Sequence, residues 1–414
     1  MPLRRLFATL VPVLAIVQAL AGAAPARAQL RDPLRSLPGL QAPGMQLPGT
    51  IPATGLQRIG DVLRQPLAIT RKLQIDALLR EQPRRVDVDP QGAPVLRGEF
   101  LAMGLSSVQG DAVRALGFAL DRQTSADATL GLDFAVLHDT RGRSTAMAMR
   151  ALQQAAPGAT FTYQHLYLPA GQDAPAAAGS TGSPSSAPAQ RVGLIDGGVD
   201  PADPALARAR IEQHGCTTAS ISRHGTAVAA RLVAGDADTL FAADLWCGDA
   251  VGGAVSNLVD ALSWMARERV AVINISLVGP DNPVLARAVK AMIARGHVLV
   301  SAVGNDGPAA PPLFPAAYPG VIGVAGVDAR GRVLPESGSG EQVDFCASGV
   351  IGRGRDALRG TSFAAPIVAR KAARLLDAPR DGAASEVQQR LIGEARPSGA
   401  AGHDPHCGYG LLSP

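Results

Sequence analysis

The sequence predicts an α/β protein built on a mostly parallel sheet with helices on both faces, preceded by a small α+β domain. Over residues 191–414, short runs of Val, Ile and Leu alternate with helical segments, which indicates a parallel sheet covered on both faces. Over residues 91–170 the predicted order is strand, helix, strand, strand, helix, strand. Between them, residues 171–190 consist almost wholly of Ala, Gly, Ser, Pro and Gln and predict a flexible linker.

The first 28 residues predict a secretory signal. Two arginines precede an apolar run over residues 6–24, and Ala-Arg-Ala at 26–28 fits the small-x-small cleavage rule. We therefore expect a secreted or periplasmic protein with no membrane association after signal cleavage. An uncleaved membrane anchor is the alternative, which Pro12 and Gln18 disfavour because they interrupt a run barely long enough to span a bilayer.

Residues 29–90 predict an irregular N-terminal arm. The segment up to about residue 60 is rich in Pro, Gly and Leu without a helical or strand period. Over residues 61–81, Leu and Ile recur at roughly helical spacing, which predicts one or two amphipathic helices ending before Pro83.

The small domain is predicted as a ferredoxin-like unit. Its predicted helices are 107–116 and 144–155, the second with Ser144 as its N-cap. Its predicted strands are 95–103, 118–121, 130–136 and 161–168. The order β-α-β-β-α-β defines the ferredoxin-like arrangement.

The larger domain carries the alternating strands and helices. The predicted strands are 192–195, 240–245, 270–275, 298–303 and 321–327. The predicted helices are 224–233, 256–267, 284–295 and 362–376. In such sheets, chemistry is expected at the carboxyl ends of the strands.

Charge and cysteine content narrow the class of protein further. The net charge of +4 is small for 414 residues and the basic residues are dispersed, so we expect no nucleic-acid partner. Four cysteines in an exported chain predict two disulfides. Sequence proximity favours Cys216 with Cys247 and Cys346 with Cys407, and buried free thiols remain the alternative.

Two candidate catalytic residues lie at predicted helix starts. Ser362 stands among small residues in Gly-Thr-Ser-Phe-Ala-Ala-Pro, where we expect an exposed hydroxyl near free backbone N–H groups. His224 opens His-Gly-Thr-Ala-Val-Ala-Ala, where the glycine permits a close approach. Taken singly, a serine before a helix is more often a cap and a lone histidine more often a structural residue.

Two further candidates end predicted strands. Asp196 follows Val-Gly-Leu-Ile and precedes two glycines, and Asn305 follows the apolar run ending in Ala-Val-Gly. Each alone is commonly a turn residue. Together with Ser362 and His224, however, they place a carboxylate, an imidazole, an amide and a hydroxyl at one edge of one sheet.

Several ordered segments carry a family resemblance. They are Val-Gly-Leu-Ile-Asp-Gly-Gly-Val-Asp (192–200), His-Gly-Thr-Ala-Val-Ala (224–229), Asn-Ile-Ser-Leu-Val-Gly-Pro (274–280), Ala-Val-Gly-Asn (302–305) and Gly-Thr-Ser-Phe-Ala-Ala-Pro (360–366). These segments resemble those of the subtilisin-like serine peptidases, and the resemblance covers residues 191–414. The order Asp, His, Ser is that of subtilisin.

The resemblance implies a role for each candidate. Ser362 would be the nucleophile, His224 the general base and acid, and Asp196 the residue that orients the imidazole. Asn305 would donate to the oxyanion. A polypeptide substrate would bind as an added strand, along Ser276, Leu277, Val278, Gly279, Ser301, Ala302, Val303 and Gly304.

The resemblance also implies that the ferredoxin-like unit is a propeptide. Such a domain assists folding and inhibits by placing its C-terminal strand, here residues 164–169, in the cleft. We therefore expect a secreted endopeptidase made as a zymogen and acting as a monomer, with its own propeptide domain as a partner. The alternative is a catalytically silent peptide-binding relative, which the presence of all four catalytic residue types disfavours.

Three positions depart from the family pattern. Ala227 replaces a histidine and Arg370 replaces a glycine, whereas Val278 replaces a glycine at the rim of the primary pocket. The branched side chain of Val278 predicts a preference for small or medium apolar residues before the cleaved bond. No acidic cluster has the spacing of a calcium loop, so we expect no metal or other cofactor, and a structural calcium ion is not indicated.

Overall fold

The computed structural model describes residues 71–170, 189–218, 220–236, 238–352, 354, 357–398 and 402–414. The predicted signal segment, most of the arm and residues 171–188 of the linker lie outside the described residues. The described residues all belong to one compact unit. Among the helices described, none is both long and apolar enough to cross a membrane.

A parallel sheet of seven strands forms the centre of the larger domain, in the order β14-β13-β12-β10-β7-β9-β8. Its strands are β7 (Arg191–Asp196), β8 (Arg210–His214), β9 (Thr239–Asp244), β10 (Val272–Ile275), β12 (Val298–Ala302), β13 (Ile322–Val327) and β14 (Phe345–Ser348). The inner strands β10, β12 and β13 are buried at every position, which is why they consist almost wholly of apolar residues. The prediction of a mostly parallel sheet is confirmed.

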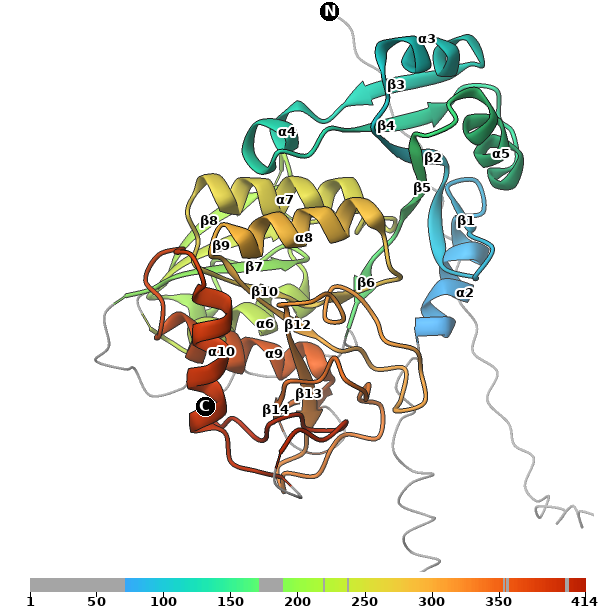
Figure 1. Cartoon of the computed structure of the whole chain (residues 1–414). Coiled ribbons are helices and arrows are strands. Elements are labelled where there is room, and N and C mark those ends of the chain that lie inside the picture. Colours follow the sequence, from blue (N-terminus) through green and yellow to red (C-terminus); the bar gives the residue numbers. More distant parts are fainter. Residues whose placement is uncertain are drawn as a thin grey trace, which may run out of the picture. The chain divides into compact units, whose positions relative to one another are not determined.

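Helices cover both faces of this sheet (Figure 1). Helices α7 (Val255–Arg267) and α8 (Pro283–Ala294) lie on one face, and α6 (Arg223–Val233) and α9 (Ala365–Ala373) on the other. Alternate residues of each strand point to opposite faces. Val272 therefore packs in the cluster with α6 and α9, whereas Ile273 packs in the cluster with α7 and α8.

The helix after Ser362 differs from its prediction. Residues Thr361–Phe363 form a 3₁₀ turn, η3, and α9 begins only at Ala365, with Pro366 in its first turn. Proline is favoured there because its missing N–H has no helical partner to lose. A further helix, α10 (Ala383–Glu394), was not predicted from the sequence.

The smaller domain is an antiparallel sheet in the order β5-β2-β4-β3, with β1 also paired to β2. Its elements are α2 (Arg71–Glu81), β1 (Val86–Val88), β2 (Pro94–Met103), α3 (Ser107–Ala115), β3 (Phe118–Arg122), α4 (Thr124–Leu130), β4 (Phe134–Asp139), α5 (Thr145–Ala155) and β5 (Thr160–His165). From β2 to β5 the predicted β-α-β-β-α-β order is present, with the additional helix α4 between β3 and β4. Ser144 caps α5 as predicted, accepting a hydrogen bond from the Met147 N–H.

One predicted strand of this domain was wrong at its beginning. The alternation of apolar residues from 130 onward predicted a strand, but Leu130 ends helix α4 and β4 starts only at Phe134. Leu130 and Leu132 are buried in a cluster that also contains Leu258 and Leu262 of α7. Their apolar character serves contact with the larger domain, which local periodicity does not reveal.

Polar contacts join the two domains at the starts of α7 and α8. Helix α7 has no side-chain cap of its own, and the Gln164 side-chain oxygen of β5 accepts from the Ser256 N–H at 3.2 Å. Asn282 caps α8 with its oxygen and donates its amide to the Tyr163 carbonyl (3.2 Å). Strand β5 thus accepts a hydrogen bond from the first turn of α7, which satisfies an orphan N–H there, and another from the side chain of Asn282, the residue that caps α8.

All four cysteines are paired as sequence proximity predicted. The disulfides are Cys216–Cys247 and Cys346–Cys407. The first links the segment after β8 to the loop after β9, and the second links β14 to the C-terminal segment. Each closes a loop within the larger domain and therefore restricts its unfolded chain.

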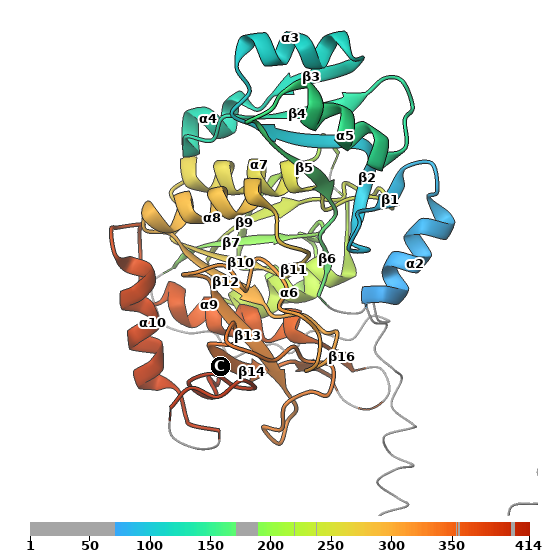
Figure 2. The same cartoon turned by 45° about the vertical axis from the view of Figure 1, so that its right-hand side comes forward.

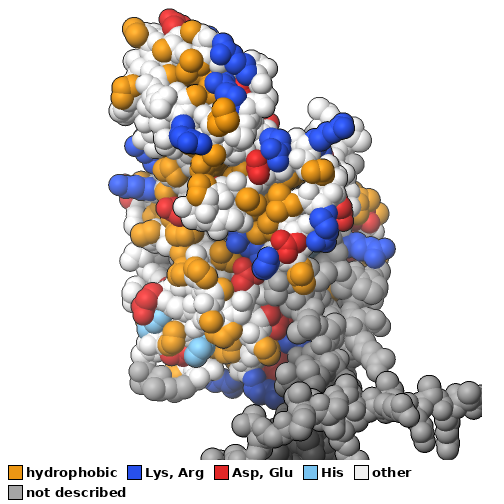
Figure 3. Space-filling view, turned by 90° about the vertical axis from the view of Figure 1, so that its right-hand side faces the viewer, with side chains coloured by type: hydrophobic (Ala, Val, Ile, Leu, Met, Phe, Trp, Pro, Cys, Tyr) orange, Lys and Arg blue, Asp and Glu red, His pale blue; other side chains and the backbone are white. Residues whose placement is uncertain are grey.

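Basic and acidic side chains are interspersed on the face shown in Figure 3. Outside the grey atoms, blue and red side chains alternate there with apolar ones rather than gathering by sign. This face therefore presents no broad field of one charge.

Candidate active site

Asp196 and His224 form a buried pair at the carboxyl end of the central sheet. Asp196 is the last residue of β7, and His224 lies in the first turn of α6. His224 Nδ1 lies 2.9 Å from Asp196 Oδ1, and both side chains are almost fully buried. Because a carboxylate only accepts, Nδ1 is the donor in this pair, and Nε2 is the ring nitrogen that the pair does not use.

Glycines allow this pair to form. A side chain on Gly225 would place its Cβ 2.3 Å from the Gly197 carbonyl oxygen, so only glycine permits α6 to start so close to the end of β7. Ser222 caps α6 by accepting from the Gly225 N–H at 3.1 Å. The Gly197 N–H also donates to Asp196 Oδ1 (2.6 Å), which fixes the orientation of the carboxylate.

Ser362 lies in the η3 turn, beside His224. The ring of Phe363, the next residue, lies 5.3 Å from the His224 ring, centroid to centroid. Ser362 is fully buried, and its hydroxyl makes no hydrogen bond within the part of the chain that the structure describes. The expectation of an exposed hydroxyl was therefore wrong, because residues far back in the sequence cover it.

Asn305 is held beside Ser362 by the same turn. Its side-chain oxygen accepts from the Thr361 N–H at 3.0 Å, and the Thr361 hydroxyl accepts from the Gly304 N–H at 3.2 Å. The Asn305 amide group is thereby turned away from Thr361. It donates to the backbone carbonyl of Ala170.

The Ala170 carbonyl oxygen receives two hydrogen bonds. Besides the Asn305 amide, the Ser362 backbone N–H donates to it at 3.2 Å. Two N–H donors converging on one carbonyl oxygen, next to a serine, form the geometry that stabilises an oxyanion during acyl transfer. The structure thus places Asn305 and Ser362 at a peptide carbonyl, with the Asp196–His224 pair beside the turn that carries Ser362.

The segment before Ala170 lies extended between two backbone partners. The short strand β6 (Leu168–Pro169) pairs antiparallel with β11 (Leu277–Val278), as Figure 2 shows. The Ala170 N–H donates to the Ser276 carbonyl at 3.0 Å. On the other side, the Tyr167 N–H donates to the Gly253 carbonyl at 2.8 Å.

The predicted binding edge is present in one half and corrected in the other. Ser276, Leu277 and Val278 carry the backbone pairing just described, and Gly279 lies directly under the Tyr167 ring. Ser301, Ala302 and Val303, in contrast, are buried within the central sheet, where β12 pairs with β10 and β13. Their backbone is thus not an edge for an added strand. Gly304, at the end of that strand, lies near Val278.

A cavity of about 510 Å³ opens beside the Asp196–His224 pair. Pro169 lines it together with both members of the pair. Residues 220–224, Asp244, Trp246 and residues 248–250 complete its wall. The Pro169 side chain therefore lies on the same side as the His224 imidazole. Because side chains alternate along an extended strand, the Ala170 side chain points to the opposite side.

Within the described residues, one group of three potential metal ligands has its ligand atoms close together. It consists of Cys216, Asp244 and Cys247. The two sulfurs form a disulfide and so cannot act as thiolate ligands. The group does not fit a metal site.

The comparisons with known proteins agree with this geometry. The sequence model of the subtilase family, peptidase family S8, matches residues 188–410. The chain belongs to the subtilase family. Its matched segment contains Asp196, His224, Asn305 and Ser362.

Similar curated proteins are bacterial subtilases. The chain is 33% identical over 171 residues to the minor extracellular protease Epr of Bacillus subtilis, covering 39% of this chain and 26% of Epr. It is 34% identical over 153 residues to subtilisin DY of Bacillus licheniformis, covering 34% and 56% of the two chains. It is 29% identical over 226 residues to a subtilisin of Bacillus pumilus, covering 49% and 82%. The chain thus spans only about a quarter and about half of the first two relatives.

A solved structure supports the fold. Fervidolysin from Fervidobacterium pennivorans, described as a keratinolytic enzyme related to subtilisin, superposes with a TM-score of 0.63 at 18% identity. The match covers 79% of this chain and 61% of fervidolysin. At that identity it shows a shared subtilisin-like fold.

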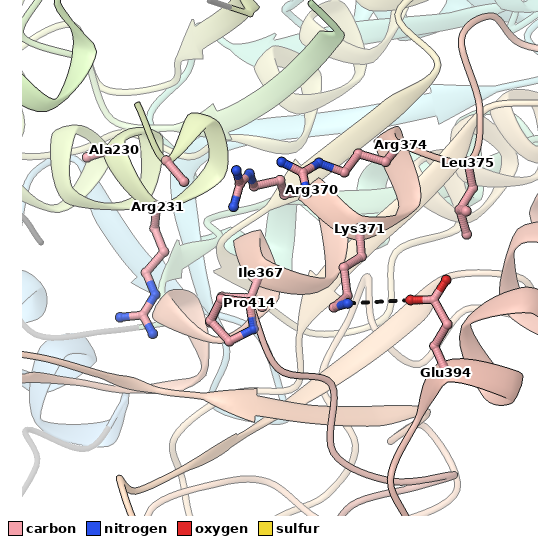
Figure 4. Close-up of a pocket in the computed structure, with 10 residues that line it drawn as sticks. Ala230, Arg231, Ile367, Arg370, Lys371, Arg374, Leu375, Glu394 and Pro414 are labelled. Carbon is pink, nitrogen blue, oxygen red and sulfur yellow. Dashed lines mark hydrogen bonds and ion pairs between the residues drawn. The ribbon is translucent and has the colours of Figure 1, made fainter. Parts of the chain in front are cut away.

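The departure of this subtilase at Arg370 has a structural explanation. Arg370 and Arg374 of α9 both contact the Asp236 carboxylate, at 2.7 and 3.1 Å. They line a cavity of about 470 Å³ between α6 and α9, together with Arg231 and with Lys371, which pairs with Glu394 (Figure 4). Burial lowers the pKa of Arg231 to about 10. The arginine at position 370 therefore links α9, which follows the turn that carries Ser362, to the segment that follows α6.

Sequence reasoning missed three contributors to the site of this subtilase. Ala170 provides the carbonyl in the oxyanion position, Gly253 forms the second backbone edge, and Leu313 lies near Gly304. For Gly253 a signal existed in the Gly-Gly pair at 252–253, because its φ of +76° and its approach to the Tyr167 carbonyl both require glycine. Ala170 and Leu313 carry no local signal.

Proposed function

We propose that this chain is a secreted serine endopeptidase, made as a zymogen, that hydrolyses peptide bonds through Asp196, His224 and Ser362. The observation that carries the proposal is the Ala170 carbonyl, which accepts from the Asn305 amide and the Ser362 N–H. A peptide carbonyl so held is where a nucleophile at Ser362 would attack. The bond between Ala170 and Gly171 is then the first bond to be cleaved.

Each step is assigned to one residue of the proposed site. Ser362 Oγ adds to the Ala170 carbonyl carbon while His224 takes its proton, and the negative oxygen is stabilised by Asn305 and the Ser362 N–H. The tetrahedral intermediate then collapses, the bond to the Gly171 nitrogen breaks, and His224 returns the proton to that nitrogen. Water, deprotonated by His224, releases the acyl group from Ser362. Asp196 keeps the imidazole oriented through both halves.

The domain before residue 171 has the role of a propeptide in this proposal. Its last strand supplies the backbone that β11 and Gly253 hold, and its sheet packs on α7 and α8. Such a domain blocks the cleft until it is cut and released. The burial of Ser362 fits a nucleophile that is covered in the uncut chain.

Self-processing gives a direct test. The full-length protein and its Ser362→Ala variant are incubated at several concentrations, and the products are identified by intact mass and N-terminal sequencing. A new terminus at Gly171 in the native protein only, at a rate independent of concentration, supports cleavage within one molecule. Cleavage of Ser362→Ala at the same bond would contradict it.

A fluorophosphonate probe separates the enzyme from a silent peptide-binding relative. Ser362 should become labelled as the new terminus appears, because the covering segment must leave first. Asp196→Asn and His224→Ala should suppress both events. Absence of labelling after the covering domain has been released would instead indicate a silent relative.

A further inference from the structure

The space beyond Ala170 is occupied by side chains of the larger domain. Ala170 itself is buried and belongs to one apolar cluster with Val278, Leu313 and Phe363. In an extended strand its methyl group points away from the side on which Pro169 faces His224. That methyl group thus enters the region between β11 and the end of β12.

Leu313 borders this region at Gly304. Its Cδ1 lies 2.7 Å from the position that a Cβ on Gly304 would take, and Val278 Cγ1 lies 3.7 Å from the same point. Leu313 is 7% exposed and Val278 is 3% exposed, so both side chains are buried beside Gly304. Two branched side chains therefore close the space next to Gly304, one residue before the oxyanion donor Asn305.

A second recognition element lies three residues before Ala170. Tyr167 is fully buried, and its ring lies against Gly279, where a Cβ would stand 2.8 Å from ring carbons. Its hydroxyl donates to the Pro280 carbonyl. Burial raises the pKa of Tyr167 well above its usual value, so the phenol remains a donor throughout the physiological range.

The hydroxyl of Tyr167 ends in a polar environment rather than in an apolar one. Nearby, the Tyr318 hydroxyl donates to Asp281 at 2.9 Å and accepts from the Asn282 N–H at 2.9 Å. A pocket that ends in a carbonyl acceptor favours a phenol over a plain phenyl ring, because the acceptor loses its partner when the hydroxyl is missing.

We propose that the enzyme acts on polypeptides in which a tyrosine stands three residues before an alanine or glycine, and that it cleaves after that small residue. Leu313, with Val278, excludes larger residues from the position before the cleaved bond, and Gly279 with Pro280 selects the tyrosine. This inference rests on the proposed peptidase function. It makes the enzyme selective for one short pattern instead of broadly degradative.

Peptide substrates test the proposed preference for a small residue before the cleaved bond. Acetyl-Tyr-Leu-Pro-X with a fluorogenic leaving group is assayed for X = Ala, Gly, Val, Leu and Phe, using full-length protein that has processed itself. Forcing a large side chain into a filled pocket predicts that Phe and Leu react about 10- to 100-fold more slowly than Ala in kcat/KM. Equal or faster cleavage after Phe or Leu would overturn the proposal.

The Leu313→Ala variant tests the residue assigned to this selection. Opening the pocket should raise the ratio of kcat/KM for Phe over Ala by about tenfold or more. If Leu313→Ala does not fold, Val278→Ala is used in its place, with a smaller rise expected. An unchanged ratio in a folded variant would refute the assignment to that residue.

The proposed preference for tyrosine is tested by substitutions in the substrate and in the enzyme. Replacing Tyr by Phe in the substrate should lower kcat/KM by about 2- to 10-fold, the effect of one neutral hydrogen bond. In the Gly279→Ala variant, the ratio of kcat/KM for substrates with Tyr to that for substrates with Ala three residues before the cleaved-bond residue should fall sharply. The new methyl group would occupy the place of the tyrosine ring. A ratio that stays unchanged would argue against this pocket.

These outcomes are distinct from failure of the proposed function. If no peptide is hydrolysed and Ser362 is not labelled by the fluorophosphonate, the peptidase function itself fails. If peptides are hydrolysed with Arg, Phe or Leu preferred before the bond, the function stands and only the selectivity proposal falls.

Discussion

Replacing Asn305 by alanine should reduce kcat by about 10²–10³ and leave KM almost unchanged. The range is the one known for the corresponding amide of subtilisin itself, a member of the same family. In this structure two donors reach the Ala170 oxygen, the Asn305 amide and the Ser362 N–H. Loss of one donor leaves the second in place, so activity is reduced and not abolished. The effect falls on kcat because the hydrogen bond strengthens as negative charge develops on the oxygen.

A matched variant separates chemistry from structure. Asn305 also accepts from the Thr361 N–H at 3.0 Å, a contact that could hold the serine turn in place. Asn305→Asp keeps this acceptor but removes the donor and adds negative charge beside the oxyanion. We therefore expect kcat to decrease from the native enzyme to Asn305→Ala and further to Asn305→Asp.

The assay measures kcat and KM on a fluorogenic Tyr-Leu-Pro-Ala peptide, with active enzyme counted by fluorophosphonate labelling. The reasoning would be refuted if Asn305→Asp were as active as the native enzyme while Asn305→Ala were not. That result would mean that Asn305 acts only by anchoring Thr361.

Three further predictions concern stability, measured by urea unfolding in a Ser362→Ala background that prevents self-digestion. The Cys216–Cys247 disulfide closes a loop with a sequence separation of 31. Removing it should lower the free energy of unfolding by about 3–4 kcal/mol. No change in the unfolding midpoint would contradict the loop-entropy argument. Burial raises the pKa of Asp344 to about 6 from 3.8, so the folded protein binds more protons than the unfolded chain between these values. Stability should therefore fall by about 3 kcal/mol as pH rises from about 4 to above 6, and Asp344→Asn should flatten this dependence. Arg370→Met should lower the free energy of unfolding by only about 1–2 kcal/mol, because Arg374 still contacts Asp236. An unchanged free energy of unfolding would indicate that the Arg374 contact alone is enough.

The inner part of the fold was predictable because its signals are local. Strands β7, β10, β12 and β13 are rich in Val, Ile, Leu, Ala and Gly, and each ends close to the predicted residue. The outer strand β8 has no such run, since its sequence Arg-Ile-Glu-Gln-His is only partly buried. Strand β14 is only four residues long, too short for periodicity to show.

The candidate site was predictable only in its polar residues. Asp196, His224, Asn305 and Ser362 stand at strand ends and helix starts, and parallel topology brings such positions to one edge. The burial of Ser362 was not predictable, because it depends on a contact with Ala170, 192 residues earlier in the numbering (362 minus 170). Long-range contacts of this kind leave no mark in local sequence patterns.

The position of Leu313 illustrates the same limit. It belongs to the segment Pro-Pro-Leu-Phe-Pro, which reads as an irregular loop. Only the folded chain brings its side chain to Gly304 and Val278. The narrowing predicted from Val278 stays a prediction, and the part proposed for Leu313 could not be identified from the sequence.

The segment ending at Ala170 is hydrogen-bonded along both sides, to Gly253 on one and to Ser276 and β11 on the other. Neither a helix nor a hairpin strand can offer its backbone in that way, because its own N–H and C=O groups are already engaged. A folded target must therefore release several consecutive residues from its own structure before it can enter. The free energy of that local opening adds directly to the activation barrier for cleavage. Two proteins with the same recognition pattern would thus be cut at rates that differ by the stability of the segment that carries it.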